Sequence, residues 1–270
     1  MAQTPAEDIV GSPRWNRVQR IGGAAHYLDD FLGDLKRRLH LELIERWGGV
    51  PRDGRVLKTD LFEESIGPDA YLPALGANGA IAIGMDLSPS VACRARARDA
   101  GRVAFYLATD TRSLPFADES FRLIICPSTL DHFPDPRDLG LSLRELARVL
   151  TADGRIIVTL DNRQNILDPL LRLVNRLGWT PYYLGRSYTV RELRRELELA
   201  GFTVQDTTAI LQNPRLLAVG AVTLARKLRW SPLTKAVRRT IIGAQRLERT
   251  RLRYYLGSFV AAIATRKLQR

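Results

Sequence analysis

The sequence predicts an α/β protein built on a seven-stranded, mostly parallel sheet with helical additions. Short apolar runs typical of strands alternate along the chain with longer helix-like runs, and this order is typical of a parallel sheet wrapped by helices. Two of the runs, residues 80–85 and 122–126, are almost continuously apolar, as expected for strands buried on both faces. A hydrophobic content of 45% in 270 residues is sufficient to build a core.

The individual elements follow from local pattern and punctuation. Apolar residues recur every three or four positions from Leu28 to Trp47, which predicts an amphipathic helix. Thr189 and Glu192 form a capping-box signal at the start of another helix, and Gly201 is expected to end it. Strands are expected over residues 55–59, 80–85, 103–107, 122–126, 154–160, 202–208 and 258–265. Helices are expected over 27–47, 89–100, 138–150 and 189–200.

We expect one domain over residues 27–270, preceded by a loose N-terminal segment, 1–26. Two segments interrupt the alternation of strands and helices. Residues 161–188 form an aromatic insertion after the fifth strand, where it would cover the carboxyl ends of the strands that bind ligands in open α/β sheets. Residues 209–256 form a basic, mostly helical addition before the last strand.

Several function classes are disfavoured by composition. No metal-ligand spacing links Cys93, Cys126, His26, His40 and His132, so no metal site is expected. The N-terminus lacks the features of a secretory signal, and no apolar stretch reaches the roughly 18 residues of a spanning helix. We expect a cytoplasmic protein with reduced thiols, soluble or peripherally bound to a membrane.

The net charge of +12 is concentrated at one end of the chain. Residues 211–270 hold 14 of the 41 Lys and Arg residues and one of the 29 Asp and Glu residues, which leaves 27 and 28 in residues 1–210. The segment 211–253 could bind an anionic membrane surface or RNA. It could equally pack its apolar positions on the sheet and expose its arginines to water.

An acid at the end of the second strand is the first candidate functional residue. The segment GMDLSPSVACRARARDAG, 84–101, places Asp86 where a carboxylate could accept both ribose hydroxyls of a nucleoside. Ser88 is expected to cap the following helix and Pro89 suits its first turn. Alternatively, Asp86 could be an ordinary turn residue.

The order of the motifs resembles the class I S-adenosylmethionine (SAM) methyltransferase family. The resemblance is carried by VAFYLATDTRSLPFADESFRLIIC (103–126), PSTLDHFPDP (127–136), LRELARVLTADGRIIVTLDN (143–162) and TVRELRRELELAGFTVQ (189–205). It covers about 50–210 and the final strand, and it implies a Rossmann-like class I methyltransferase fold with SAM as cofactor. It further implies that Asp86 and Leu87 bind the ribose side, and that Asp110, Thr111 and Pro127 surround the adenine.

The loop after the first strand departs from the family pattern. Such enzymes carry a glycine-rich loop there, whereas this chain has KTDLFEE over 58–64. Side chains with a Cβ narrow such a turn. In one interpretation Lys58 and Thr59 replace the lost methionine contacts, with Asp60 or Glu63 on the α-amino group. In the other, cofactor binding is weak or lost.

The acceptor side of the site is less specified. Methyl transfer depends mainly on proximity and alignment, and a base helps when the acceptor is a hydroxyl. His132 is the candidate base, or else a loop-forming residue, and Asp131 and Asp135 are interpreted as turn residues. Four aromatic residues are candidate substrate contacts: Tyr27, Trp179, Tyr182 and Tyr183.

We therefore predict a methyltransferase for a small molecule, with O-methylation of a metabolite, lipid or sugar-bearing acceptor. One alternative is an RNA methyltransferase. Another is a repurposed, non-catalytic protein that binds a membrane or partner through its basic helices.

Overall fold

The computed structural model describes residues 29–77, 79–101, 104–177, 184–213, 215–228 and 230–267. Its seven strands form one sheet in the order β3-β2-β1-β4-β5-β7-β6. The first five in this order run parallel, and β7 runs antiparallel to both of its neighbours. The predicted seven-stranded, mostly parallel sheet is confirmed. The strands are β1 Arg55–Lys58, β2 Ile81–Asp86, β3 Ala104–Ala108, β4 Phe121–Pro127, β5 Leu150–Asp161, β6 Phe202–Ile210 and β7 Phe259–Arg266.

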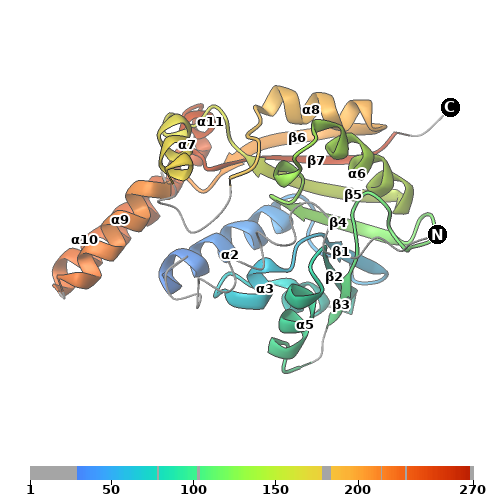
Figure 1. The fold of residues 1–270 in the computed structure, drawn as a ribbon, viewed down its shortest axis with the longest axis horizontal. Helices are drawn as coiled ribbons and strands as arrows, with labels where there is room; N and C mark the ends of the chain where they lie inside the picture. Colours follow the sequence, from blue (N-terminus) through green and yellow to red (C-terminus); the bar gives the residue numbers. More distant parts are fainter. Residues whose placement is uncertain are drawn as a thin grey trace.

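Helices cover both faces of this sheet, with α2, α3 and α5 on one side and α6 and α8 on the other (Figure 1). Successive strand residues point to opposite faces, so Val56 joins one core cluster and Leu57 the other. The helices are α2 Asp30–Arg46, α3 Phe62–Ile66, α4 Leu72–Gly76, α5 Pro89–Arg98, α6 Pro136–Val149, α7 Asp168–Arg176, α8 Val190–Leu199, α9 Arg215–Lys227, α10 Ser231–Ala244 and α11 Arg253–Leu256. Two short 3-10 turns are η3 Leu130–His132 and η4 Gln245–Arg249.

The capping signals mostly have the predicted roles. The capping box of Thr189 and Glu192 is present at the start of α8, and Gly201 follows the helix with a φ of 92°. Ser88 occupies the N-cap position of α5 as expected, but its side chain makes no capping hydrogen bond there. Instead, the Ser88 amide donates to Asp86 Oδ1 at 2.8 Å.

The insertion after β5 leaves the sheet and returns to the same place. The Arg163 amide donates to the Tyr188 carbonyl at 3.0 Å, and the Tyr188 amide donates to the Asp161 carbonyl at 2.8 Å. Between them, the Arg186 amide donates to the carbonyl of Asp131 at 2.6 Å. The returning chain therefore packs on η3, at the carboxyl end of β4.

Gly185 makes this contact sterically possible. A Cβ at position 185 would lie 1.9 Å from the carbonyl oxygen and 2.5 Å from the carbonyl carbon of Asp131. The obstacle is backbone, which cannot move aside as a flexible side chain would.

Among the described residues, none of the helices combines the length and the apolar character that a membrane span requires.

We expect Gly185→Ala to destabilise the protein by at least about 2 kcal/mol, because the added methyl group separates the insertion from η3. Gly220→Ala is the matched control, since nothing lies within 4 Å of a Cβ there and alanine favours a helix by about 0.5–1 kcal/mol over glycine. Urea unfolding monitored by circular dichroism measures both. Equal stability of the two variants would contradict this packing.

Candidate functional site

The loop between β1 and α3, where the family resemblance fails, is organised around a buried lysine. The Lys58 ammonium is fully buried, donates to the Asp60 carbonyl at 2.5 Å and pairs with Glu63 at 3.1 Å and Glu64 at 2.7 Å. It also lies 4.8 Å from the centroid of the Tyr71 ring. Burial alone would lower the pKa of the Lys58 ammonium, but Glu63 and Glu64 raise it well above its ordinary value.

This arrangement favours a structural role for Lys58 over the ligand contact expected from the sequence. Its ammonium already contacts two carboxylates and a carbonyl, and no part of its side chain is exposed. Its ammonium therefore holds the loop together through partners within the protein. Glu63 is likewise a member of this network, because its second oxygen accepts from Lys36 of α2 at 2.8 Å.

The network extends through two elements that flank the loop. Glu64 accepts the amides of Tyr71 and Leu72 at 3.2 and 3.0 Å, which fixes the start of α4. Lys36 also pairs with the buried Asp69 at 2.9 Å. Burial acts to raise the pKa of Glu63, but Lys36 and Lys58 lower it far below its usual range. Burial raises the pKa of Glu64 despite Lys58.

The loop closes without glycines because the neighbouring strand provides the space. Leu61 is fully buried and packs over Gly84 of β2, where a Cβ would lie 2.4 Å from a Leu61 methyl carbon and 2.5 Å from one of Leu72. The Leu61 amide donates to Asp86 Oδ2 at 3.2 Å. A glycine in β2 thus accommodates the Leu61 side chain of this glycine-free loop.

Two acids remain half-exposed beside this loop. Asp86 ends β2 and accepts the amides of Leu61 and Ser88, one on each oxygen. Burial raises its pKa to about 6. Asp60 accepts the Phe62 amide at 2.6 Å, and burial together with Glu63 raises its pKa well above the usual range.

The acidic side chains of this region outnumber its ammonium groups. In the described residues of this network, the two ammonium groups of Lys36 and Lys58 face five carboxylates, namely Asp60, Glu63, Glu64, Asp69 and Asp86. Asp60 and Asp86 form no ion pair with another described residue, and they are the two half-buried acids of the five. This end of the sheet therefore favours a cationic ligand over an anionic one.

The residues expected around the adenine lie after β3 and β4. Both oxygens of Asp110 accept from the Arg112 guanidinium, at 3.0 Å from Nε and 2.6 Å from a terminal nitrogen. Thr111 is buried and hydrogen-bonds to Ser142 of α6 at 3.2 Å. Leu87 is half-exposed next to Asp86, and Pro127 is buried at the end of β4.

Thr59 connects the ends of the two central strands. Its hydroxyl donates to Cys126 Sγ at 3.1 Å and lies 3.0 Å from the Thr129 hydroxyl. Thr59 is buried, so we expect it to fix the loop after β4 relative to the loop after β1.

The candidate base lies beside a buried carboxylate. Asp131 is fully buried, and its Oδ2 accepts the Ser128 hydroxyl and the Asp161 amide, both at 2.8 Å. Asp131 Oδ1 lies 3.7 Å from His132 Nε2, and the imidazole is 20% exposed. Burial raises the pKa of Asp131. The interpretation of Asp131 as a turn residue was incomplete, because its carboxylate joins three segments, whereas Asp135 does cap α6.

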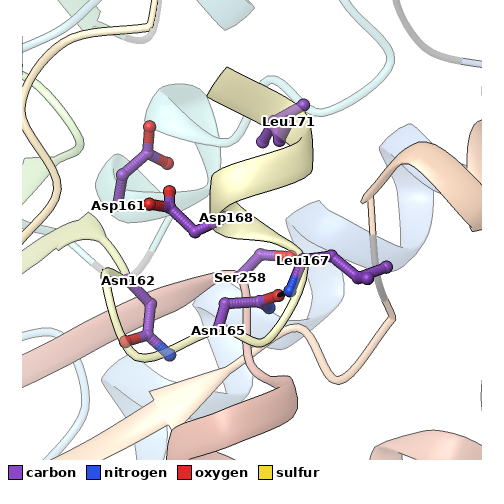
Figure 2. Close-up of a pocket in the computed structure, with 7 residues that line it drawn as sticks. All are labelled: Asp161, Asn162, Asn165, Leu167, Asp168, Leu171 and Ser258. Atoms are coloured by element: carbon purple, nitrogen blue, oxygen red, sulfur yellow. Dashed lines mark hydrogen bonds between the residues drawn. The ribbon is translucent and has the colours of Figure 1, made fainter. Parts of the chain in front are cut away.

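A partly open pocket with about 340 Å³ of empty space adjoins this turn (Figure 2). Figure 2 shows the carboxylates of Asp161 and Asp168 pointing to the same side of it. Asp168 accepts from Ser187 and Arg172 at 2.8 and 2.9 Å. The pocket is lined by Asp161, Asn162, Asn165, Leu167, Asp168, Leu171 and Ser258.

The four aromatic residues predicted to contact substrate, Tyr27, Trp179, Tyr182 and Tyr183, lie outside the described residues. Sequence reasoning missed Lys36, Asp69 and Asp161 as members of the site. Lys36 sits on α2, 27 residues before its partner Glu63, and no local motif marks it. Asp161 could have been identified, because it ends a buried strand next to the others.

One protein-family model matches part of this chain. Residues 63–158 match the family model of a methyltransferase domain.

This match covers 96 of the 270 residues of the chain.

A 68-residue stretch is 41% identical to the uncharacterized methyltransferase YcgJ of Bacillus subtilis strain 168, covering 24% of this chain and 25% of that relative. The match thus spans about a quarter of the relative's length.

Solved structures agree on the fold of almost the whole chain. A SAM-dependent methyltransferase of Thermotoga maritima, described as a possible histamine N-methyltransferase, has a TM-score of 0.60 at 18% identity, covering 94% of this chain and 100% of that one. A complex of the Haloferax volcanii Trm112 methyltransferase activator with a proposed methyltransferase gives 0.60 at 17% identity, covering 95% and 99%. The class I methyltransferase fold of this chain is confirmed.

We expect Lys58→Met to destabilise the protein by about 3–5 kcal/mol, because it leaves two buried carboxylates without their shared cation. The exposed Lys227→Met is the control and should stay within about 0.5 kcal/mol of the parent. Urea unfolding measures both. A Lys58→Met protein as stable as the control would contradict the central role of this network.

Proposed function

We propose that the protein transfers a methyl group from SAM to a hydroxyl of a small-molecule acceptor. The observation that carries the proposal is the half-buried carboxylate of Asp86 at the end of β2, beside a loop with excess negative charge. A nucleoside needs an acceptor for its ribose hydroxyls at this position of such a sheet. SAM bears a sulfonium and an ammonium against one carboxylate, so its net positive charge fits the excess of carboxylates.

The residues present fit the cofactor in most of its parts. Asp86 would accept the ribose hydroxyls while retaining the amides of Leu61 and Ser88, since an ionised carboxylate has about four lone-pair sites. Asp60 would take the α-ammonium group. Asp110 would face the adenine and accept a hydrogen bond from it with a lone pair that Arg112 does not use. Leu87, Thr111 and Pro127 would lie nearby. Glu63, Lys58 and Thr59 would position the loop without touching the ligand.

SAM supplies a methyl group that is already activated by its positive sulfur. The protein then has to bring an acceptor hydroxyl into line and receive its proton. His132 would take that proton, and the buried carboxylate of Asp131, 3.7 Å away, would stabilise the resulting imidazolium. Ser128 and the Asp161 amide hold that carboxylate in place.

The acceptor is proposed to bind in the pocket of Figure 2. The side chains of Asp161 and Asp168 would accept hydrogen bonds from hydroxyl or amino groups, and Leu167 and Leu171 would pack on an apolar part. Asp161 connects this pocket to the candidate base, because its amide binds Asp131.

We expect S-adenosylhomocysteine to bind the purified protein, and Asp86→Asn to weaken binding by at least about tenfold, because an amide accepts fewer hydrogen bonds. Asp53→Asn is the control, since this acid is 79% exposed and precedes β1 at the opposite edge of the sheet. Isothermal titration calorimetry measures each affinity. Absence of binding at millimolar ligand would reject the proposal and favour the repurposed, non-catalytic alternative.

The raised pKa of Asp86 predicts a pH dependence. Its carboxyl is protonated below about pH 6 in the free protein, whereas a bound ribose and a cationic cofactor favour the ionised form. Affinity for SAM should be constant above about pH 7 and fall by up to about tenfold per pH unit below about pH 6. Asp86→Asn should remove this slope, and an equally steep slope in that variant would show that another group titrates.

A further inference from the structure

Helices α9 and α10 form a hairpin that extends away from the sheet (Figure 1). The surfaces that hold the hairpin together are already covered. On α9, Ala218, Val222 and Ala225 are buried, and Ile241 is buried on α10. Val222 and Ile241 belong to the same core cluster as α2. These residues therefore join the hairpin to the core, and the outer surface of the hairpin does not contribute to it.

The outer surface of α9 carries large apolar side chains. Leu217, Leu224 and Leu228 recur at seven and four residues, which places them on one stripe. They are 62%, 56% and 57% exposed, and Trp230, just before α10, is 59% exposed. No described residue covers this stripe, whereas a single exposed leucine would need no explanation.

The same hairpin is uniformly positive. Residues 215–244 contain seven Lys and Arg residues and no Asp or Glu. Arg226 and Lys227 are exposed beside the leucines, and Lys235, Arg238 and Arg239 are exposed on α10. The guanidinium of Arg238 lies 5.0 Å from the centroid of the Phe31 ring, near the start of α2.

We propose that the α9–α10 hairpin is a docking element for an anionic lipid bilayer. Leucines with a tryptophan and basic residues, without acids, are the combination that lies at the boundary between headgroups and acyl chains. RNA would pair with the arginines but offers nothing to exposed leucines. A protein partner would have to provide both an acidic surface and an apolar groove, whereas a bilayer provides both at once.

A second apolar helix at this end of the molecule supports the same orientation. Leu170 and Leu173 on α7, together with Ile166 and Leu177 just before and after it, are 47–61% exposed. The Ile166 amide donates to the Tyr255 carbonyl at 3.0 Å, which joins α7 to α11, next to the base of the hairpin. Since Leu167 and Leu171 also line the pocket of Figure 2, that pocket would face the lipid side.

The test is co-sedimentation of the full chain with vesicles. Vesicles of phosphatidylcholine alone are compared with vesicles that also contain phosphatidylglycerol. We expect binding to the anionic vesicles, weakened by high salt. Two double variants on exposed positions, Leu224→Ser with Leu228→Ser and Arg226→Glu with Lys227→Glu, should each reduce binding by at least about tenfold.

Matched controls separate this surface from general effects of hydrophobicity and charge. Leu199→Ser removes a leucine that is 68% exposed on α8, and Arg94→Glu with Arg96→Glu makes the same change in net charge on exposed positions of α5. Both should bind as the parent does. The proposal is overturned if the parent does not bind anionic vesicles, if the hairpin variants bind as well as the controls, or if the leucines instead mediate self-association in light scattering. None of these outcomes depends on whether the protein binds SAM.

Discussion

The ion cluster around Lys58 is the constraint on which this site depends. A buried ammonium between two carboxylates is stable only when every charge is paired and hydrogen-bonded, and here Glu63 and Glu64 have further partners in Lys36 and the start of α4. The cluster therefore fixes three elements together, namely α2, the loop after β1, and α4. A loop without glycines can keep one conformation because these contacts determine it.

This arrangement separates two tasks that a glycine-rich loop would combine. The buried members of the cluster give the loop its shape, and the half-exposed acids Asp60 and Asp86 give it a charge that a ligand can meet. Burial is a cost to the ionised forms of both acids in the unliganded protein, visible in the raised pKa of each. A cation bound beside them would relieve that cost, which is the physical reason to expect a positively charged cofactor.

Much of the fold could be predicted from the sequence, because strand 122–126 and the α8 capping box are specified by local pattern. The position of Asp86 followed for the same reason, since it ends a recognisable strand. The role of Lys58 was not predictable. Whether a lysine beside two glutamates faces solvent or the core depends on α2 and α4, and α4 is too short to leave a periodic signal.

The insertion and the hairpin show the same distinction. Composition identified both as additions, but only the three-dimensional structure shows that Gly185 packs on the backbone of Asp131 and that the α9 leucines are left uncovered. Contacts of this kind join residues that are far apart in the chain, so no local pattern records them.

The most direct test of the account is a crystal structure of the protein with S-adenosylhomocysteine. The account predicts that the ribose hydroxyls contact Asp86 while the Lys58 ammonium stays on Glu63 and Glu64, buried and away from the ligand. A structure in which Lys58 leaves these carboxylates to bind the ligand's carboxylate would contradict it.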